Sequence, residues 1–206
     1  VPPTLLFSLI GNHTDVRKAV SSDFKDAGDK IYLLGETHQE LGASELAFML
    51  RDESSGESGI GGKVPEINPE RNLAMYRALT GAMTHGLVAS AHDCSDGGLA
   101  SALAECCFGS DSGATVNLSP IMSDCKKIDE WGALFGESLG RILVSIKPSD
   151  CEAFESVMSN HACYQIGKVE EGDTISFSNS IDRVLSASMS ELRSAWKGTL
   201  DGGGPQ

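Results

Sequence analysis

The chain has 206 residues, of which 40% are hydrophobic, and its 29 acidic and 16 basic residues give a formal net charge of -13. This length is enough for one substantial core and predicts a single domain over residues 1–206. We expect no nucleic-acid partner, because phosphate recognition needs clustered Lys and Arg and the sequence has no such cluster. The apolar run near the N-terminus is too short for a signal peptide or a membrane span, so no membrane partner is expected.

Cysteine usage points to a reducing compartment. The six cysteines form no CxxC pair and show no metal-ligand spacing. A chain of this size does not need disulfides to hold its core, and disulfides are rare in the cytoplasm. We therefore expect a cytoplasmic protein.

The first half of the chain alternates strand and helix patterns around one polar loop. In order, the predicted elements are a strand over residues 4–11, a strand over 29–36, a helix over 40–50, a loop over 51–69, a helix over 69–87 and a short buried strand over 87–93. The loop is rich in Gly, Ser and acidic residues, and its tip should tolerate change.

The second half continues the alternation and adds one hairpin. In order, the predicted elements are a helix over residues 98–108, a strand over 114–119, a short helix or turn over 127–138, a strand over 140–148, a helix over 149–160, a hairpin over 163–179 with its turn at 170–173, a helix over 188–200 and a disordered tail over 201–206. This order predicts an α+β fold, with a mixed or antiparallel sheet and helices on one side.

The turn between the strand and the helix at residues 92–98 carries an unusual number of polar groups. Its candidate ligand-facing residues are His92, Asp93, Ser95, Asp96, Gly97 and Gly98. The first turn of a helix leaves backbone N–H groups free, and glycines let an anionic ligand approach them. Asp93 offers the carboxylate oxygen that hard divalent cations prefer. Alternatively, Ser95 or Asp96 caps the helix, the glycines pack against a neighbouring strand, and His92 is a satisfied core histidine.

Two further stretches place polar residues at turns: "LGETHQELGASEL" over residues 34–46 and "LFGESLGRILV" over residues 134–144. Their candidate cleft residues are Glu36, Ser44, Glu45, Glu137, Ser138 and Arg141. Arg141 can clamp an anion through its bidentate fork, or pair with a nearby carboxylate. The acids of the first stretch can equally lie at the positive end of a helix dipole. No nucleophile stands beside a clearly placed base, so the pattern favours ligand contacts over covalent catalysis.

Taken together, the three stretches resemble a known family. "YLLGETHQELGASEL", "SAHDCSDGGLASALAE" and "LFGESLGRILV", in this order and at these distances, resemble the last domain of phosphoribosylformylglycinamidine synthase, in the synthetase subunit of its multi-subunit form. The signature "HDxSDGGL" followed by "ALAE" is the most specific of the matches. The resemblance covers about residues 3–200, and residues 1–12 resemble the link out of a preceding domain.

The resemblance implies a fold partner and an activity. Aminoimidazole ribonucleotide synthetase, selenophosphate synthetase and the hydrogenase maturation kinases share a pair of domains, an ATP-binding domain followed by an α+β domain like this one. The implied reaction converts formylglycinamide ribonucleotide, ATP and glutamine-derived ammonia into formylglycinamidine ribonucleotide, ADP and phosphate. ATP and Mg²⁺ are the implied cofactors. The implied partners are the preceding ATP-binding domains, the glutaminase and small accessory subunits, and a ribonucleotide substrate.

The resemblance also assigns roles to individual positions. In the synthase the pair of domains is duplicated, and this sequence resembles the second copy. Asp93 stands on the turn where the family's first copy binds magnesium, and Glu137-Ser138-Leu139 stands where that copy holds substrate with Glu-Ser-Gln. Leu139 cannot donate the amide hydrogen bonds of Gln, which favours a structural role for this copy and an inactive isolated domain. No catalytic residue is assigned, and His92 is not given the role of the family's catalytic histidine. A stand-alone binding module and another family member, such as selenophosphate synthetase, are the alternatives.

Overall fold

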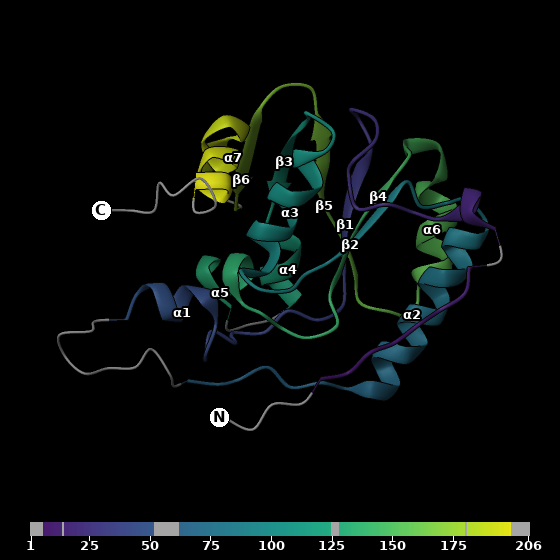
Figure 1. Cartoon of the computed structure of the whole chain (residues 1–206), viewed down its shortest axis with the longest axis horizontal. Helices are drawn as coiled ribbons and strands as arrows, with labels where there is room; N and C mark the ends of the chain where they lie inside the picture. The colour runs from purple at the N-terminus through teal and green to yellow at the C-terminus, as the bar shows by residue number, and fades with distance from the viewer. Residues whose placement is uncertain (1–5, 14, 52–61, 125–127, 180, 199–206) are drawn as a thin grey trace.

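The computed structural model describes residues 6–13, 15–51, 62–124, 128–179 and 181–198 (Figure 1). Seven strands form one open sheet in the order β2-β4-β1-β5-β3-β6-β7. The strands are β1 (Lys30–Leu34), β2 (Ser90–Asp93), β3 (Gly113–Asn117), β4 (Ile142–Ile146), β5 (Cys163–Glu170), β6 (Thr174–Ser178) and β7 (Arg183–Ser188). Neighbouring strands are antiparallel except β3 and β6, which are parallel, so the sheet is mixed as expected.

Seven helices are described, of which α2 is the longest. They are α1 (Glu45–Met49), α2 (Pro69–Thr84), α3 (Gly98–Phe108), α4 (Ser119–Asp124), α5 (Glu130–Phe135), α6 (Cys151–Met158) and α7 (Met189–Gly198), with 3-10 turns at Val16–Lys18 and Pro148–Asp150. Within the described part of the chain, no helix combines the length and apolar character needed to cross a membrane.

The helices cover both faces of the sheet, which corrects the expectation that they lie on one side. Side chains alternate along β1, so Ile31 and Leu33 join the core formed with α3, α4, α5 and α7, whereas Tyr32 and Leu34 join the core formed with α2 and α6. Figure 1 shows α2 and α6 together on one side of the sheet and α3, α4, α5 and α7 across from them. The central strands are therefore buried on both faces and read as continuous apolar runs.

The predicted hairpin over residues 163–179 is wrong. Strands β5 and β6 follow each other in the chain, but β3 lies between them and pairs with both. Two glycines permit the close approach: a Cβ on Gly167 would lie 2.1 Å from the carbonyl oxygen of Thr115, and one on Gly113 would lie 2.3 Å from that of Thr174. The turn at residues 170–173 therefore starts a crossover rather than a hairpin.

Other boundaries also differ from the predictions. In the predicted strand over residues 4–11, the described residues 6–11 form no strand and have exposed side chains. The helix predicted over 40–50 begins only at Glu45, because Ser44 is extended and its Oγ accepts the backbone N–H of Ala47 at 3.2 Å. Helix α4 and strand β7 were not predicted. The predicted tail over 201–206 lies outside the described residues.

Candidate functional site

The three polar stretches meet at one end of the sheet. Strands β1 and β2 both pair antiparallel with β4, and Leu34 and Asp93 both lie opposite Ile142. The residues that follow β1 and β2 therefore lie beside those that precede β4. The sequence predicted this grouping only by analogy, and the strand order provides its physical cause.

Glu137 joins the three stretches. Its Oε1 accepts the backbone N–H of Gly97 and that of Glu45, each at 2.9 Å. The next residue, Ser138, accepts the backbone N–H of His38 at its Oγ, at 3.0 Å. These two candidate cleft residues therefore bind the protein's own backbone at these atoms, and the Glu137 carboxylate accepts a hydrogen bond from an amide of the glycine turn.

Arg141 is a buried structural residue at the centre of this end of the sheet. Its side chain is almost fully buried, and its guanidinium donates to the carbonyls of Ser138 and Gly136 and to the Thr37 hydroxyl. Burial lowers the pKa of Arg141, an effect opposed by the nearby Cys94, Glu40 and Glu137. The hydrogen bonds of the guanidinium in the described part of the chain go to carbonyl and hydroxyl oxygens, and Arg141 also lines the second cavity described below, so its role as an anion clamp stays a prediction.

The polar side chains of the glycine turn are partly engaged with each other. His92 Nε2 lies 2.5 Å from Glu105 Oε2 on α3, so this histidine is satisfied locally. The Oγ of Ser95 donates to Asp93 Oδ2 at 2.6 Å, and this hydrogen bond is the main reason that the pKa of Asp93 is lowered. The Asp93 side chain is 71% exposed, so its carboxylate remains open to a partner. Asp96 is exposed beside it.

The two glycines of the turn are required for packing. Gly98 has φ +67, and a Cβ there would lie 2.6 Å from the carbonyl oxygen of Gly136. Gly97 has φ +75 and stands at the N-cap of α3, where no side chain caps the helix. Ser95 and Asp96 therefore do not cap α3, contrary to that alternative, and the close approach predicted for the glycines is to the end of α5 rather than to a strand.

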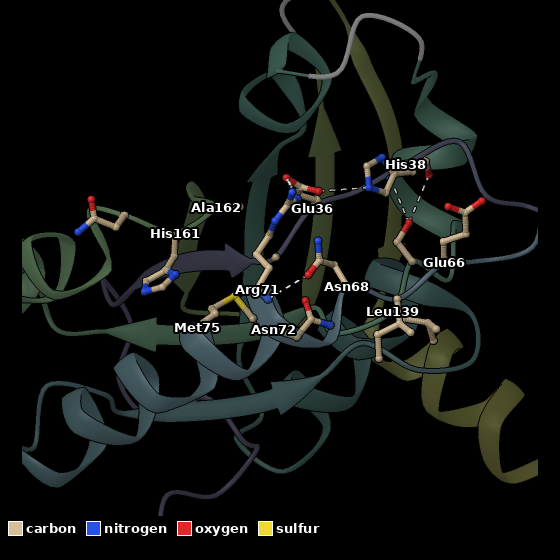
Figure 2. A pocket seen from close by; sticks show the side chains of 14 residues that line it. Glu36, His38, Glu66, Asn68, Arg71, Asn72, Met75, Leu139, His161 and Ala162 are labelled. Atoms are coloured by element: carbon tan, nitrogen blue, oxygen red, sulfur yellow. Dashed lines mark hydrogen bonds and ion pairs between the residues drawn. The ribbon is translucent and has the colours of Figure 1, made fainter.

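The three polar stretches, joined by Glu137, form what we call the turn cluster. A cavity of about 450 Å³ opens beside it, between the end of β1, the start of α2 and the loop before β5 (Figure 2). Its polar lining includes Glu36, which forms an ion pair with Arg71 and lies 3.5 Å from His38 Nε2. Figure 2 shows Arg71 reaching from α2 toward Glu36, with His161 near Met75 at the left of the view. Sequence reasoning found Glu36 and Ser138 but missed Arg71 and His161. Arg71 could have been found as a basic residue one turn into a capped helix, whereas nothing in the sequence signals His161.

A second cavity of about 380 Å³ lies across Leu139, which lines both. Its lining includes Asp93, Asp96 and Glu137, with Tyr76 of α2 on the facing wall. Burial raises the pKa of Tyr76, and the negative charge of Asp93 adds to the shift. The six predicted cleft residues therefore do not form one cleft. The first cavity is lined by Glu36 and Ser138, the second by Glu137 and Arg141, and neither by Ser44 or Glu45.

The described residues do not fit a magnesium site built by this chain alone. Among them, no group of three or more His, Cys, Asp or Glu side chains could hold a metal ion. Asp93 is a single exposed carboxylate, and Mg²⁺ sites usually add waters and substrate phosphates to one or two such ligands.

Comparison with known proteins assigns the family. Residues 26–178 match the family described as "AIR synthase related protein, C-terminal domain", and the chain belongs to this family.

Similar solved structures include several of PurL from Thermotoga maritima. The chain is 20% identical to PurL complexed with ATP, with a TM-score of 0.67. The match covers 86% of this chain and 27% of the PurL chain. The complex with FGAR gives 20% identity and a TM-score of 0.74, with 86% and 30% covered. The HypE-HypF complex is more distant, at 17% identity and a TM-score of 0.56, with 82% and 54% covered. The chain thus spans less than a third of the PurL chains, and identities this low show a shared fold.

Proposed function

We propose that this chain is the C-terminal domain of an ATP-dependent phosphoribosylformylglycinamidine synthase, with a structural and cleft-forming role. The full enzyme would convert formylglycinamide ribonucleotide, ATP and glutamine-derived ammonia into formylglycinamidine ribonucleotide, ADP and phosphate. In this proposal residues 1–12 link the domain to preceding ATP-binding domains, and a glutaminase and small accessory subunits deliver ammonia. The described cysteines are free thiols, which is consistent with a cytoplasmic location.

One observation carries the proposal: the three stretches that define the resemblance are bound together through the Glu137 carboxylate. Spacing alone could have matched by chance, but here each stretch contributes atoms to one contact cluster at the end of the sheet. The family assignment and the structural similarity to PurL complexes with ATP and FGAR support the same reading.

The same contacts argue that this copy is not the catalytic one. Glu137 and Ser138 are engaged with backbone groups, and Arg141 is buried under its own turn. The groups that remain open toward a neighbouring domain are Asp93 and the walls of the two cavities. We propose that Asp93 contributes one carboxylate to nucleotide or Mg²⁺ binding in the assembled enzyme.

The test is ADP release by the full-length protein with ATP, Mg²⁺ and ammonia. We expect release that depends on formylglycinamide ribonucleotide, and none above blank from residues 1–206 alone. Turnover by the isolated chain, or full-length turnover that ignores this substrate, would contradict the proposal. Selenide-dependent formation of AMP and phosphate from ATP, rather than ADP release, would identify the selenophosphate synthetase alternative.

A cheaper observation addresses the stand-alone binding module. An ATP-binding domain encoded in frame before Val1 supports the ligase, whereas a start codon there supports the module. In the full-length enzyme, Asp93→Asn should weaken nucleotide affinity more than the turnover rate. The matched control is Asp173→Asn, because Asp173 likewise accepts a hydroxyl hydrogen bond from a neighbour but lies in the turn before β6. Equal effects of the two substitutions would argue against a role for Asp93.

A further inference from the structure

The walls of the 450 Å³ cavity are held in place by backbone contacts. The backbone N–H of Gly35 donates to the carbonyl of Ala162 at 3.0 Å, which ties the end of β1 to the loop before β5. Asn68 caps α2 on the facing side by accepting the N–H of Arg71 at 3.0 Å. A fixed cavity of this volume, with a few polar groups converging from separate elements, is typical of a small-molecule site.

The charged pair on the wall is, in contrast, easily separated. The side chains of Glu36 and Arg71 are 41% and 52% exposed, and exposed ion pairs contribute only about 0.2–1 kcal/mol. Glu36 and Arg71 therefore meet each other in the empty cavity at little energetic advantage. A ligand can replace this contact if it supplies a better partner to both groups.

The charges restrict which ligand can do so. A ligand with a single negative charge that takes Arg71 leaves Glu36 with only the His38 imidazole, 3.5 Å away, and close to a second anion. A ligand with a single positive charge that takes Glu36 leaves Arg71 without its counter-ion and close to a second cation. A zwitterion pairs with both, and a charge-assisted hydrogen bond to each is stronger than a neutral one.

We propose that this cavity binds a small zwitterion, an α-amino acid with an uncharged side chain. Its carboxylate pairs with Arg71 and its ammonium group with Glu36. Its side chain packs against the apolar part of the wall, formed by Ile67, Met75 and Leu139. Glu66, which is exposed at the same wall, disfavours acidic amino acids. Amino-acid binding here does not require the reaction proposed above, although Glu36 and Ser138, which line the cavity, are also candidate cleft residues.

The test is calorimetric titration of residues 1–206 with L-leucine and with two analogues that each lack one charge. N-acetyl-leucine keeps the carboxylate and leucinamide keeps the ammonium group. We expect millimolar or tighter binding of leucine, with both analogues at least about tenfold weaker, the loss of one charged pairing. No binding of leucine at millimolar concentration would overturn the proposal, as would equal binding of either analogue or of inorganic phosphate.

Variants separate the two charge contacts. Glu36→Gln should weaken leucine binding while leaving N-acetyl-leucine unchanged or improved, and Arg71→Gln should do the same for leucinamide. The matched control is Arg17→Gln, which breaks an exposed ion pair with Asp15 outside the cavity and should leave leucine affinity unchanged. Leucine affinity that survives both cavity substitutions would refute the site. The analogue titrations on the unaltered chain decide the question even if a variant fails to fold.

Discussion

Replacing Arg141 with methionine tests whether this residue supports the fold or binds a ligand. The substitution keeps an unbranched, flexible side chain but removes donors that now bind the carbonyls of Ser138 and Gly136 and the hydroxyl of Thr37. Each buried acceptor left without a partner costs about 1–3 kcal/mol. Because two of the three acceptors are backbone carbonyls that cannot turn to solvent, we expect a loss of about 3–5 kcal/mol. That is a large part of the 5–15 kcal/mol typical of a folded domain.

The assay is urea unfolding followed by far-ultraviolet circular dichroism, with free energies extrapolated to water. The control is Arg71→Met, because Arg71 is half-exposed and its removal should cost no more than about 1 kcal/mol. If Arg141→Met also costs less than about 1 kcal/mol, the buried hydrogen bonds do not stabilise the turn cluster, and our interpretation of Arg141 is refuted.

Three further predictions concern the neighbouring residues. Gly98→Ala should destabilise by about 2–4 kcal/mol, because its Cβ would lie 2.6 Å from a backbone oxygen, whereas Gly86→Ala, with φ +75 and open space, should cost only about 1–2 kcal/mol in the same assay. Ser95→Ala should raise the pKa of Asp93 toward its ordinary value of 3.8, because it removes the hydrogen bond that lowers this pKa. Ionised Asp93 contributes stability above pH 3.8 that is lost as the pH falls through the lowered pKa, and this contribution should become smaller in the variant. Carboxyl NMR titration measures the pKa, and an unchanged value would contradict the hydrogen bond. Burial raises the pKa of the Cys94 thiol to about 11, so iodoacetamide at neutral pH should label Cys94 only after unfolding, and native labelling seen by peptide mass spectrometry would contradict this burial.

The sequence predicted those elements whose pattern reflects their own burial. Strands β1 and β4 are apolar runs because both their faces are covered, and α2 and α3 show clear apolar spacing. Strand β7 was missed because its sequence "RVLSAS" is short and half polar. The false hairpin arose because two strands separated by a Gly-containing turn normally pair, whereas β3, distant in sequence, inserts between them. Gly113 and Gly167 were the available signals of that close approach.

The site was predicted at the level of which stretches meet, but not of what each side chain does. Residue types gave Glu137 and Arg141 as ligand contacts, since carboxylate and guanidinium groups at turns commonly bind ligands. Whether such a group faces a ligand or the backbone depends on the position of the neighbouring turn, which a single sequence does not contain. Arg71 and His161 were missed for the complementary reason. The cap at Asn68 marks Arg71 as an early residue of a helix, but nothing in the sequence shows that Arg71 or His161 lines a cavity with the residues after β1.

These assignments together show how the domain can keep a recognisable signature if, as we propose, this copy has no catalytic role. The stretches that carry the resemblance provide the contacts that hold three strands' ends together: Glu137 binds two turns and Arg141 binds a third. Replacing any of these groups should destabilise the fold, so their presence does not require that this copy bind substrate. The exposed groups Glu36 and Arg71 lie beside the turn cluster, and their ion pair contributes little to the stability of the fold. Ligand binding in this domain should therefore depend on its exposed charged groups, which are Arg71 outside the signature and Glu36 and Asp93 within it. Substitutions at the buried signature positions should first reduce stability.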